Sequence, residues 1–271
     1  MTLAEVVAAA LAEDLGPLGD LTAALLPSKA TAEAFLVPRT AGVLAGCPAA
    51  REAFLQVDRN MAVAWSAWDG DDVVAGSPVA RVSGRLASVL TAERTALNFL
   101  SHLSGIATLT RRYVDAVAGT GARIRDTRKT TPGLRALEKA AVRSGGGVNH
   151  RGNLSDGILV KDNHLAGATI AEAVEGSRRL WPGRMVQVEC DTVGQLEQAL
   201  GAGADLVLLD NMSPDDVAAC VRLVAHRCLV EVSGGITLDT VAGYAAAGAD
   251  LVAIGALTHS APVLDIGLDL V

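Results

Sequence analysis

The sequence predicts an α/β protein whose larger part is a parallel sheet curled into an incomplete barrel. After residue 120 the pattern of strand, loop and helix repeats several times. Its strand candidates include the apolar runs LVLL (206–209) and LVAI (251–254), which are typical of strands buried on both faces. Half of the 271 residues are hydrophobic, which is enough for a sizeable core. Because strands that alternate with helices form right-handed βαβ units, this series favours a barrel.

The first hundred residues predict a smaller α+β layer. Residues 2–14 place apolar side chains at helical spacing, and Gly16 and Pro17 end that helix. Extended segments follow at 32–38, 61–68 and 79–82, with a short helix at 48–54 and a turn at DGDD (69–72). Residues 88–117 predict two helical segments that break near Ser104 and Gly105. We expect a first domain with its linking helix at 1–104 and a barrel at 105–271, whose extreme C-terminus could pack back on the first domain.

The predicted barrel strands end in polar or glycine-bearing segments. The strands lie at 122–126, 157–161, 185–190, 205–210, 229–233 and 250–255, and helices include 192–202, 214–226 and 238–247. Function in such barrels gathers at the carboxyl ends of the strands. Those ends hold residues 126–129, 161–164, 189–191, 210–211, 233–235 and 255–258. The last two loops, SGGI and IGALTHS, are similar to glycine-bearing phosphate loops.

Positive charge is concentrated between Arg123 and His164. This stretch holds nine Lys or Arg residues and four acids, in a chain whose formal net charge is -7. Three of the four lysines in the chain, Lys129, Lys139 and Lys161, lie within it. The candidate side chains for binding carboxylate or phosphate groups, called forks below, are those of Arg128, His150 and Arg151. The stretch therefore predicts a small ligand with several negative charges.

Several charged residues also have plain structural interpretations. Arg135, Glu138, Lys139 and Arg143 follow Pro132 at helical spacing, so we expect them to form the solvated face of a helix. An exposed pair is the ordinary interpretation of Glu93 and Arg94. The strand-end acids Glu189 and Asp210 could share a divalent metal such as Mg²⁺ or could pair with nearby Arg or Lys side chains, and the residues alone leave both alternatives open.

The overall composition narrows the function classes. Aromatic residues make up 3% of the chain and the pI is about 5.2, so the sequence offers no basic, aromatic surface for nucleic acid. It contains no uninterrupted apolar run of membrane-spanning length, and the N-terminus carries Glu5 where a signal peptide needs basic residues. We therefore expect a cytoplasmic protein without nucleic-acid or membrane partners. Cys47, Cys190, Cys220 and Cys228 lack metal-ligand spacing, which predicts reduced, mostly buried thiols.

Several segments together resemble the quinolinate phosphoribosyltransferases, also called nicotinate-nucleotide pyrophosphorylases (carboxylating). They are, in order, TAERTALNFLSHLSGIAT, RDTRKTTPGLRALEKAAVRSGGGVNHR, ILVKDNH, VEC, LVLLDNM, VSGGI and AIGALTHS. The family makes nicotinate mononucleotide, CO₂ and pyrophosphate from quinolinate and phosphoribosyl pyrophosphate, in de novo NAD biosynthesis. The resemblance implies an N-terminal open α/β sandwich followed by an incomplete α/β barrel. It also implies Mg²⁺, and a homodimer or higher homo-oligomer with composite active sites.

The resemblance assigns a role to each matching position. Arg128, His150 and Arg151, with Arg94 from a neighbouring subunit, would hold the quinolinate carboxylates. Lys129 and Lys161 would lie on the ribose and pyrophosphate side, and Glu189 and Asp210 would face the ribose and Mg²⁺. The pocket for the 5′-phosphate would be lined by Ser233, Gly234, Gly255 and His259.

Two alternative functions stay open at the level of the sequence. Lys161 at a strand end, with a late phosphate loop, also suits a Schiff-base aldolase. A paralogue of the same family is associated with molybdate transport operons and carries similar motifs. Trapping by borohydride with substrate would distinguish the aldolase, and an activity assay is needed for the paralogue.

Overall fold

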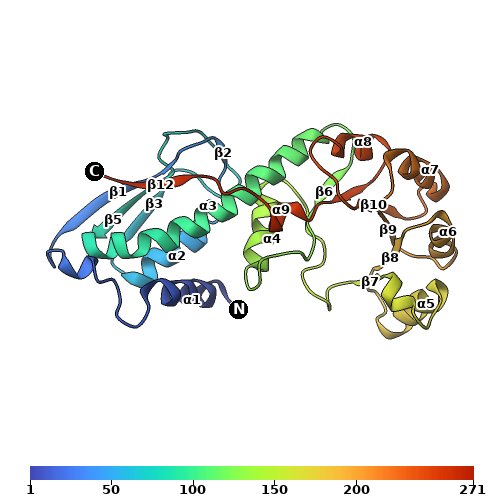
Figure 1. The fold of residues 1–271 in the computed structure, drawn as a ribbon, viewed down its shortest axis with the longest axis horizontal. Helices are drawn as coiled ribbons and strands as arrows, with labels where there is room; N and C mark the ends of the chain where they lie inside the picture. The colour runs from blue at the N-terminus through green and yellow to red at the C-terminus, as the bar shows by residue number, and fades with distance from the viewer. The chain divides into compact units, whose positions relative to one another are not determined.

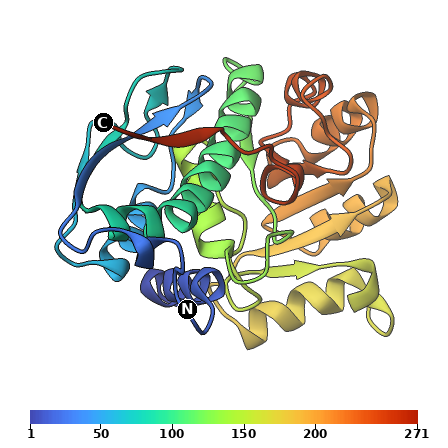
Figure 2. The same cartoon turned by 60° about the vertical axis from the view of Figure 1, so that its left-hand side comes forward.

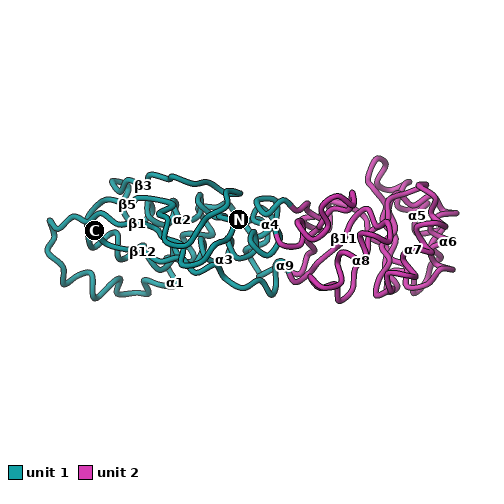
Figure 3. Tube along the Cα trace, turned by 90° about the horizontal axis from the view of Figure 1, so that it is seen from above, with its two compact units in different colours: residues 1–111, 130–146, 257–271 teal, residues 112–129, 147–256 magenta.

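The computed structural model describes the whole chain, residues 1–271, and divides it into two compact units (Figure 3). The first unit contains residues 1–111, 130–146 and 257–271, and the second contains residues 112–129 and 147–256. Each unit is therefore assembled from segments that lie far apart in the sequence.

The first unit contains an antiparallel sheet with the strand order β12-β1-β5-β3 (Figure 1). These strands are β1 (Thr31–Pro38), β3 (Ala62–Trp65), β5 (Ala80–Arg85) and β12 (Ile266–Leu270). The last strand of the chain pairs with the first, from Ala34 opposite Leu270 to Pro38 opposite Ile266. A separate ribbon joins β2 (Gly42–Val43) to β4 (Asp72–Val73).

The first unit also contains helices α1 (Leu3–Leu15) and α2 (Cys47–Val57) and most of α3 (Leu86–Ala116) (Figure 2). The expected N-terminal helix is confirmed, and a capping box begins it. The Thr2 hydroxyl accepts from the Glu5 N–H at 3.3 Å, and the Glu5 carboxylate accepts from the Thr2 N–H at 2.7 Å. The expected turn at 69–72 supports α2, because the Asp69 carboxylate accepts from the Cys47 N–H at 2.9 Å.

The predicted break near Ser104 and Gly105 is wrong, because α3 runs unbroken through both residues for 31 residues. Ser104 Oγ uses its hydrogen-bonding capacity on the backbone of Ala45, accepting at 2.9 Å and donating at 3.1 Å. A Cβ added to Gly105 would lie 2.1 Å from the Pro262 carbonyl oxygen. The glycine therefore permits a close approach of two backbones and does not end the helix.

The predicted solvated face after Pro132 is also wrong for two of its residues. Helix α4 (Arg135–Ser144) buries Glu138 completely and leaves Lys139 only 5% exposed. The Glu138 carboxylate lies 2.9 Å from His102 Nε2 and accepts from the Thr131 N–H at 3.1 Å. Burial of a carboxylate requires such partners, and helical spacing alone did not reveal them.

The second unit is a parallel sheet with the order β6-β11-β10-β9-β8-β7. Its strands are β6 (Arg123–Arg125), β7 (Ile158–Val160), β8 (Val186–Cys190), β9 (Leu206–Asp210), β10 (Leu229–Ser233) and β11 (Leu251–Ala253). All six fall within the predicted strand positions. No pairing joins β6 to β7, so the predicted incomplete barrel is confirmed.

Helices α5 (Ile170–Leu180), α6 (Val193–Gly201), α7 (Pro214–Val224) and α8 (Val241–Ala246) alternate with these strands (Figure 1). The short helix α9 (Ala256–His259) follows β11. Thr169, Thr192 and Ser213 cap α5, α6 and α7 through their side-chain oxygens. Each helix therefore begins at a defined residue just after a strand-end loop.

The cysteines are free thiols, as expected, and Cys47, Cys190 and Cys220 are buried. Burial, with nearby carboxylates, raises the pKa of the Cys190 thiol to about 12. No helix in the structure combines the length and the apolar character that crossing a bilayer requires.

Candidate active site

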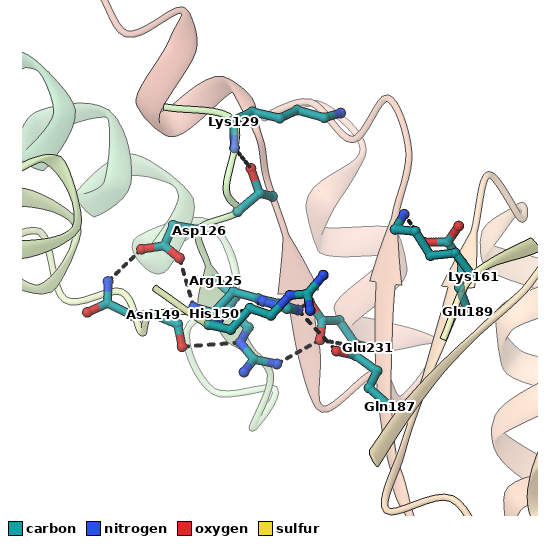
Figure 4. A network of polar contacts seen from close by, with 11 residues as sticks. Arg125, Asp126, Lys129, Asn149, His150, Lys161, Gln187, Glu189 and Glu231 are labelled. Carbon is teal, nitrogen blue, oxygen red and sulfur yellow. Dashed lines mark hydrogen bonds and ion pairs between the residues drawn. The ribbon is translucent and has the colours of Figure 1, made fainter. Parts of the chain in front are cut away.

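Lys161 and Glu189 form an ion pair at the carboxyl ends of β7 and β8 (Figure 4). The register pairs Val160 with Val188, so the next residue on each strand lies beside the other. The Glu189 side chain is 12% exposed and that of Lys161 is 41% exposed. The pair is therefore reachable from solvent while its carboxylate is mostly covered. Of the two alternatives for Glu189, the structure contains the lysine partner.

The ends of β9 and β10 form a second polar group. Asp210 pairs in register with Ser233, and the Asn211 N–H donates to the Ser233 carbonyl at 3.0 Å. The Asn211 amide also donates to the Asp210 carboxylate at 2.6 Å. Gly234 has a φ of 102°, and an added Cβ would lie 2.3 Å from Asn211 Oδ1. Only glycine fits there, so the SGG loop packs tightly against the strand end.

The loop that carries His150 and Arg151 is fixed to β6 by the buried Asp126. Its carboxylate accepts from the Asn149 amide at 2.5 Å and from the His150 N–H at 2.7 Å (Figure 4). The Val148 N–H donates to the Ile124 carbonyl at 2.8 Å. Residues 148–150 therefore run beside β6, which gives the loop a defined path.

Arg128 and Arg151 are both half-buried and lie close enough to affect each other electrostatically. Burial lowers the pKa of the Arg151 guanidinium, and the charge of Arg128 lowers it further. Two like charges in a desolvated setting are stabilised by an anion placed between them. The structure thus brings these two predicted forks together.

The other predicted residues differ in their exposure. Lys129 is exposed, and its N–H donates to the Thr127 hydroxyl at 3.0 Å. Arg94 belongs to the first unit, where its side chain is 66% exposed and lies 4.0 Å from Glu93. Arg94 is therefore exposed, as expected, whereas Glu93 is half-buried. His259 belongs to the same unit and ends α9, with Nδ1 2.6 Å from the Ser260 hydroxyl. Gly255 follows β11 and is half-buried.

Sequence reasoning missed a buried polar network inside the barrel. Arg125 on β6 donates to Glu231 on β10 at 2.7 Å, and Gln187 on β8 donates to the same carboxylate oxygen at 2.7 Å (Figure 4). His150 Nε2 lies 3.0 Å from the Gln187 amide oxygen. These strands are not neighbours in the sheet, so the contacts cross its concave interior. The available signal was a polar residue inside each of the apolar strands VQV and VEV.

A cavity of about 320 Å³ lies beside this network. Its lining includes Arg125, His150, Arg151 and Gln187, together with Leu206 at the start of β9. The described chain contains no cluster of three or more His, Cys, Asp or Glu side chains that could hold a metal ion on its own. Glu189 and Asp210 supply carboxylates at neighbouring strand ends.

Taken together, the fold and this site define a barrel enzyme that handles small anionic substrates at the carboxyl ends of its strands. Comparison with known proteins gives the family. Residues 20–104 match the model for the N-terminal domain of quinolinate phosphoribosyl transferase, and residues 106–269 match the model for its C-terminal domain. The chain belongs to the quinolinate phosphoribosyl transferase family.

Individual relatives agree along nearly the whole chain. The nicotinate-nucleotide pyrophosphorylase [carboxylating] of Mycobacterium leprae is 45% identical, and the alignment covers 96% of this chain and 94% of that protein. The probable enzyme of the same name from Bacillus subtilis is 42% identical, with coverage of 95% and 89%. The solved nicotinate-nucleotide pyrophosphorylase of Francisella tularensis superposes with a TM-score of 0.95 at 37% identity, covering 99% of this chain and 96% of that chain.

Proposed function

We propose that this chain transfers the phosphoribosyl group of phosphoribosyl pyrophosphate to quinolinate and releases CO₂, giving nicotinate mononucleotide and pyrophosphate for NAD biosynthesis. The main support is the similarity to carboxylating nicotinate-nucleotide pyrophosphorylases over more than nine-tenths of the chain. The chemistry of the site agrees, because quinolinate carries two carboxylates and the co-substrate carries several phosphate charges.

Arg128 and Arg151 are the proposed forks for the quinolinate carboxylates. Burial and the nearby charge of Arg128 lower the pKa of Arg151, and a bound dianion would offset both effects. The pyridine nitrogen is already a nucleophile, so the reaction needs no strong general base. The site has to hold the ring nitrogen near the ribose carbon and to stabilise the charges that develop.

Lys161 and Lys129 are proposed for the ribose and pyrophosphate side, and Glu189 and Asp210 for the ribose. Carboxylates would stabilise an oxocarbenium-like ribose, and ammonium groups would stabilise the departing pyrophosphate. Glu189 pairs with Lys161. This ion pair fixes the Lys161 ammonium group at the carboxyl ends of the strands. Ser233, Gly234 and Gly255 of the second unit are proposed for the 5′-phosphate. The role of His259 in phosphate binding stays a prediction from the family resemblance.

Alkylation of the ring nitrogen prepares the loss of CO₂. The positive charge on that nitrogen stabilises the carbanion left when the 2-carboxylate departs. The protein then has mainly to orient the ring, which is a task for the carboxylate forks.

The two strand-end carboxylates of Glu189 and Asp210 can supply part of the coordination shell of Mg²⁺. Mg²⁺ typically binds one or two carboxylates together with substrate phosphates and waters, so a dedicated protein cage is not required. Glu189 and Asp210 would hold it, and it would neutralise negative charge on the pyrophosphate group. Homodimeric assembly with Arg94 supplied by the partner, and a cytoplasmic location, complete the proposal.

The aldolase alternative has less support. Schiff-base lysines are activated by apolar surroundings or by a neighbouring cation, whereas Lys161 lies against the Glu189 carboxylate. The paralogue of molybdate transport operons shares the fold, so an activity measurement has to separate it from the proposed enzyme.

A comparison of quinolinate with nicotinate tests the proposal. A site built for two carboxylates leaves a cationic group without its partner when nicotinate binds, which costs roughly 2–5 kcal/mol. We expect nicotinate mononucleotide to form from quinolinate and phosphoribosyl pyrophosphate, and nicotinate to be a poor substrate. Comparable turnover of the two pyridines would contradict the assignment.

A further inference from the structure

We propose that His150 is a positioning residue whose neutral imidazole is held by a buried relay of Arg125, Glu231 and Gln187. This inference rests on the proposed function, since it assigns His150 a task in quinolinate binding. In this role the ring fixes the backbone that presents Arg151, while the guanidinium groups contact the carboxylates. It therefore differs from the direct carboxylate contact that the family resemblance implies.

The tautomer follows from the partner of Nδ1. The Arg151 backbone N–H donates to His150 Nδ1 at 2.7 Å. A backbone N–H can only donate, so Nδ1 must carry a lone pair and the ring cannot be an imidazolium. The ring proton is then on Nε2, which lies 3.0 Å from the Gln187 amide oxygen. His150 is thus the neutral Nε2–H tautomer.

The relay fixes the amide of Gln187 in the matching orientation. Gln187 Nε2 donates to Glu231 Oε2 at 2.7 Å, and Arg125 Nη1 donates to the same oxygen at 2.7 Å. With its nitrogen directed at a carboxylate, the amide must direct its oxygen at the imidazole. The relay therefore has one consistent direction, from the guanidinium through the carboxylate and amide to the ring.

The second oxygen of Glu231 favours the same tautomer. Glu231 is fully buried, and its Oε1 is a buried atom without a hydrogen-bond partner. It lies 3.9 Å from His150 Nε2. Burial raises the pKa of the Glu231 carboxyl, whereas Arg125 and the Gln187 amide lower it and stabilise its charged form. In that form Oε1 attracts a proton to Nε2. Asp126, which accepts from the His150 N–H, and Arg151, whose N–H donates to the ring, are also charged neighbours.

The consequence for binding concerns the backbone at 149–151. Asp126 holds the His150 N–H, and the ring holds the Arg151 N–H, so two successive peptide groups are fixed. The Arg151 guanidinium also donates to the Gly157 carbonyl at 3.1 Å. Loss of the relay would let the ring turn and would release the peptide that precedes Arg151. Affinity for quinolinate should fall, while affinity for phosphoribosyl pyrophosphate should not.

Nitrogen NMR of the full chain, labelled in its histidine rings, tests the tautomer without any activity measurement. At pH 7 we expect His150 to show an unprotonated Nδ1 and a protonated Nε2, with its signals assigned by their loss in His150→Asn. Imidazolium signals, or the reverse tautomer, would overturn the inference. This readout is independent of turnover, so an inactive protein would contradict the proposed function and leave the tautomer tested.

Gln187→Met tests the relay, because methionine is of similar size and lacks the amide. We expect the KM for quinolinate to rise about 10-fold or more, the KM for phosphoribosyl pyrophosphate to stay within about 2-fold, and the His150 signature to be lost. Gln198→Met, at an exposed position on α6, is the matched control and should change neither constant. Equal rises in both KM values, or an unchanged KM for quinolinate, would contradict the claim that the relay positions His150 for quinolinate binding. If Gln187→Met does not fold, the NMR result on the unaltered chain decides.

Discussion

Arg128 and Arg151 show why the type of cation matters at the level of single residues. A guanidinium presents a planar fork to a carboxylate, whereas an ammonium is a compact point charge. The pKa of Arg151 is lowered by burial and by Arg128, so this part of the site is desolvated as well as cationic. The geometry of the donor therefore matters here as well as its charge.

Arg128→Lys should therefore impair quinolinate use selectively. We expect kcat/KM for quinolinate to fall at least ~10-fold, equivalent to about 1.4 kcal/mol, because the bidentate contact is lost. The KM for phosphoribosyl pyrophosphate should change little. Steady-state kinetics with each substrate varied in turn makes the comparison. Equal weakening of both substrates would place Arg128 on the phosphate side.

Single residues also show what the sequence could and could not predict about the site. The positions of Lys161, Glu189, Asp210 and Ser233 at strand ends were predictable, because parallel strands bring their carboxyl ends to one edge, while their roles stay predictions. Glu231 and Gln187 were not, because they lie within strands and take their roles from partners two strands away. No local spacing encodes such a contact.

At the scale of elements, a substitution at Gly105 in α3 separates the effect of close packing on stability from the effect of helix propensity. In an open helix, Gly→Ala should stabilise by about 0.5–1 kcal/mol. At Gly105 the new methyl group would meet the Pro262 carbonyl at 2.1 Å, so we expect Gly105→Ala to lower the free energy of unfolding. Gly176→Ala in α5, with no atom within 4 Å of the added Cβ, is the matched control and should stabilise. Denaturant unfolding measures both, and a stabilised Gly105→Ala would refute the close contact.

Asp58 links β5 to the start of α3 and makes stability depend on pH. Hydrogen bonds from the Asn60 N–H, from Arg85 and from Ser88 lower its pKa from 3.8 to about 2. A depressed pKa means that the unfolded chain binds the proton more readily. The stabilisation is therefore present above about pH 4 and is lost as the pH falls towards about 2.

Asp58→Asn should consequently lower Tm at pH 7 and reduce the fall of Tm between about pH 4 and about pH 2. Thermal unfolding across this range, with the exposed Asp239→Asn as control, measures the difference. An unchanged acid dependence in Asp58→Asn would show that other carboxylates dominate.

The elements were predicted to different degrees. The barrel strands were predictable because each is a short apolar run bounded by turn residues, and β10 begins and ends at the residues expected. The expected break in α3 and the expected solvated face of α4 failed for one physical reason. Gly105 packs against Pro262 and Glu138 pairs with His102, and helical periodicity carries no information on such contacts between distant segments.

At the scale of the whole molecule, the predicted α/β architecture could be read from the alternation of elements, since parallel strands require crossover connections. The sequence indicated only that the extreme C-terminus could pack back on the first domain. It did not indicate the pairing of β12 with β1 or its register, because this pairing joins the two ends of the chain and no turn marks it. The pattern of residues along one chain also gives no direct sign of the proposed dimer, because a dimer interface depends on contacts between two chains.

The proposal that Arg94 acts in the partner's site can be tested by complementation. Arg94→Ala and Lys161→Ala subunits, each inactive alone, are mixed under conditions that allow exchange. Random exchange makes about half of the dimers mixed, and each mixed dimer regains one intact site, so activity should return to roughly a quarter of the unaltered level. Mass-tagged subunits verify exchange. If exchange occurs and no activity returns, Arg94 acts within its own subunit.

The central claim is that ribosyl transfer to quinolinate is coupled to loss of its 2-carboxylate. Quinolinate labelled at that carboxylate, with Mg²⁺ and purified protein, tests it most directly. We predict that labelled CO₂ is released only when phosphoribosyl pyrophosphate is present, in a one-to-one ratio with nicotinate mononucleotide. Release without phosphoribosyl pyrophosphate, or a nucleotide product that retains the label, would contradict the account.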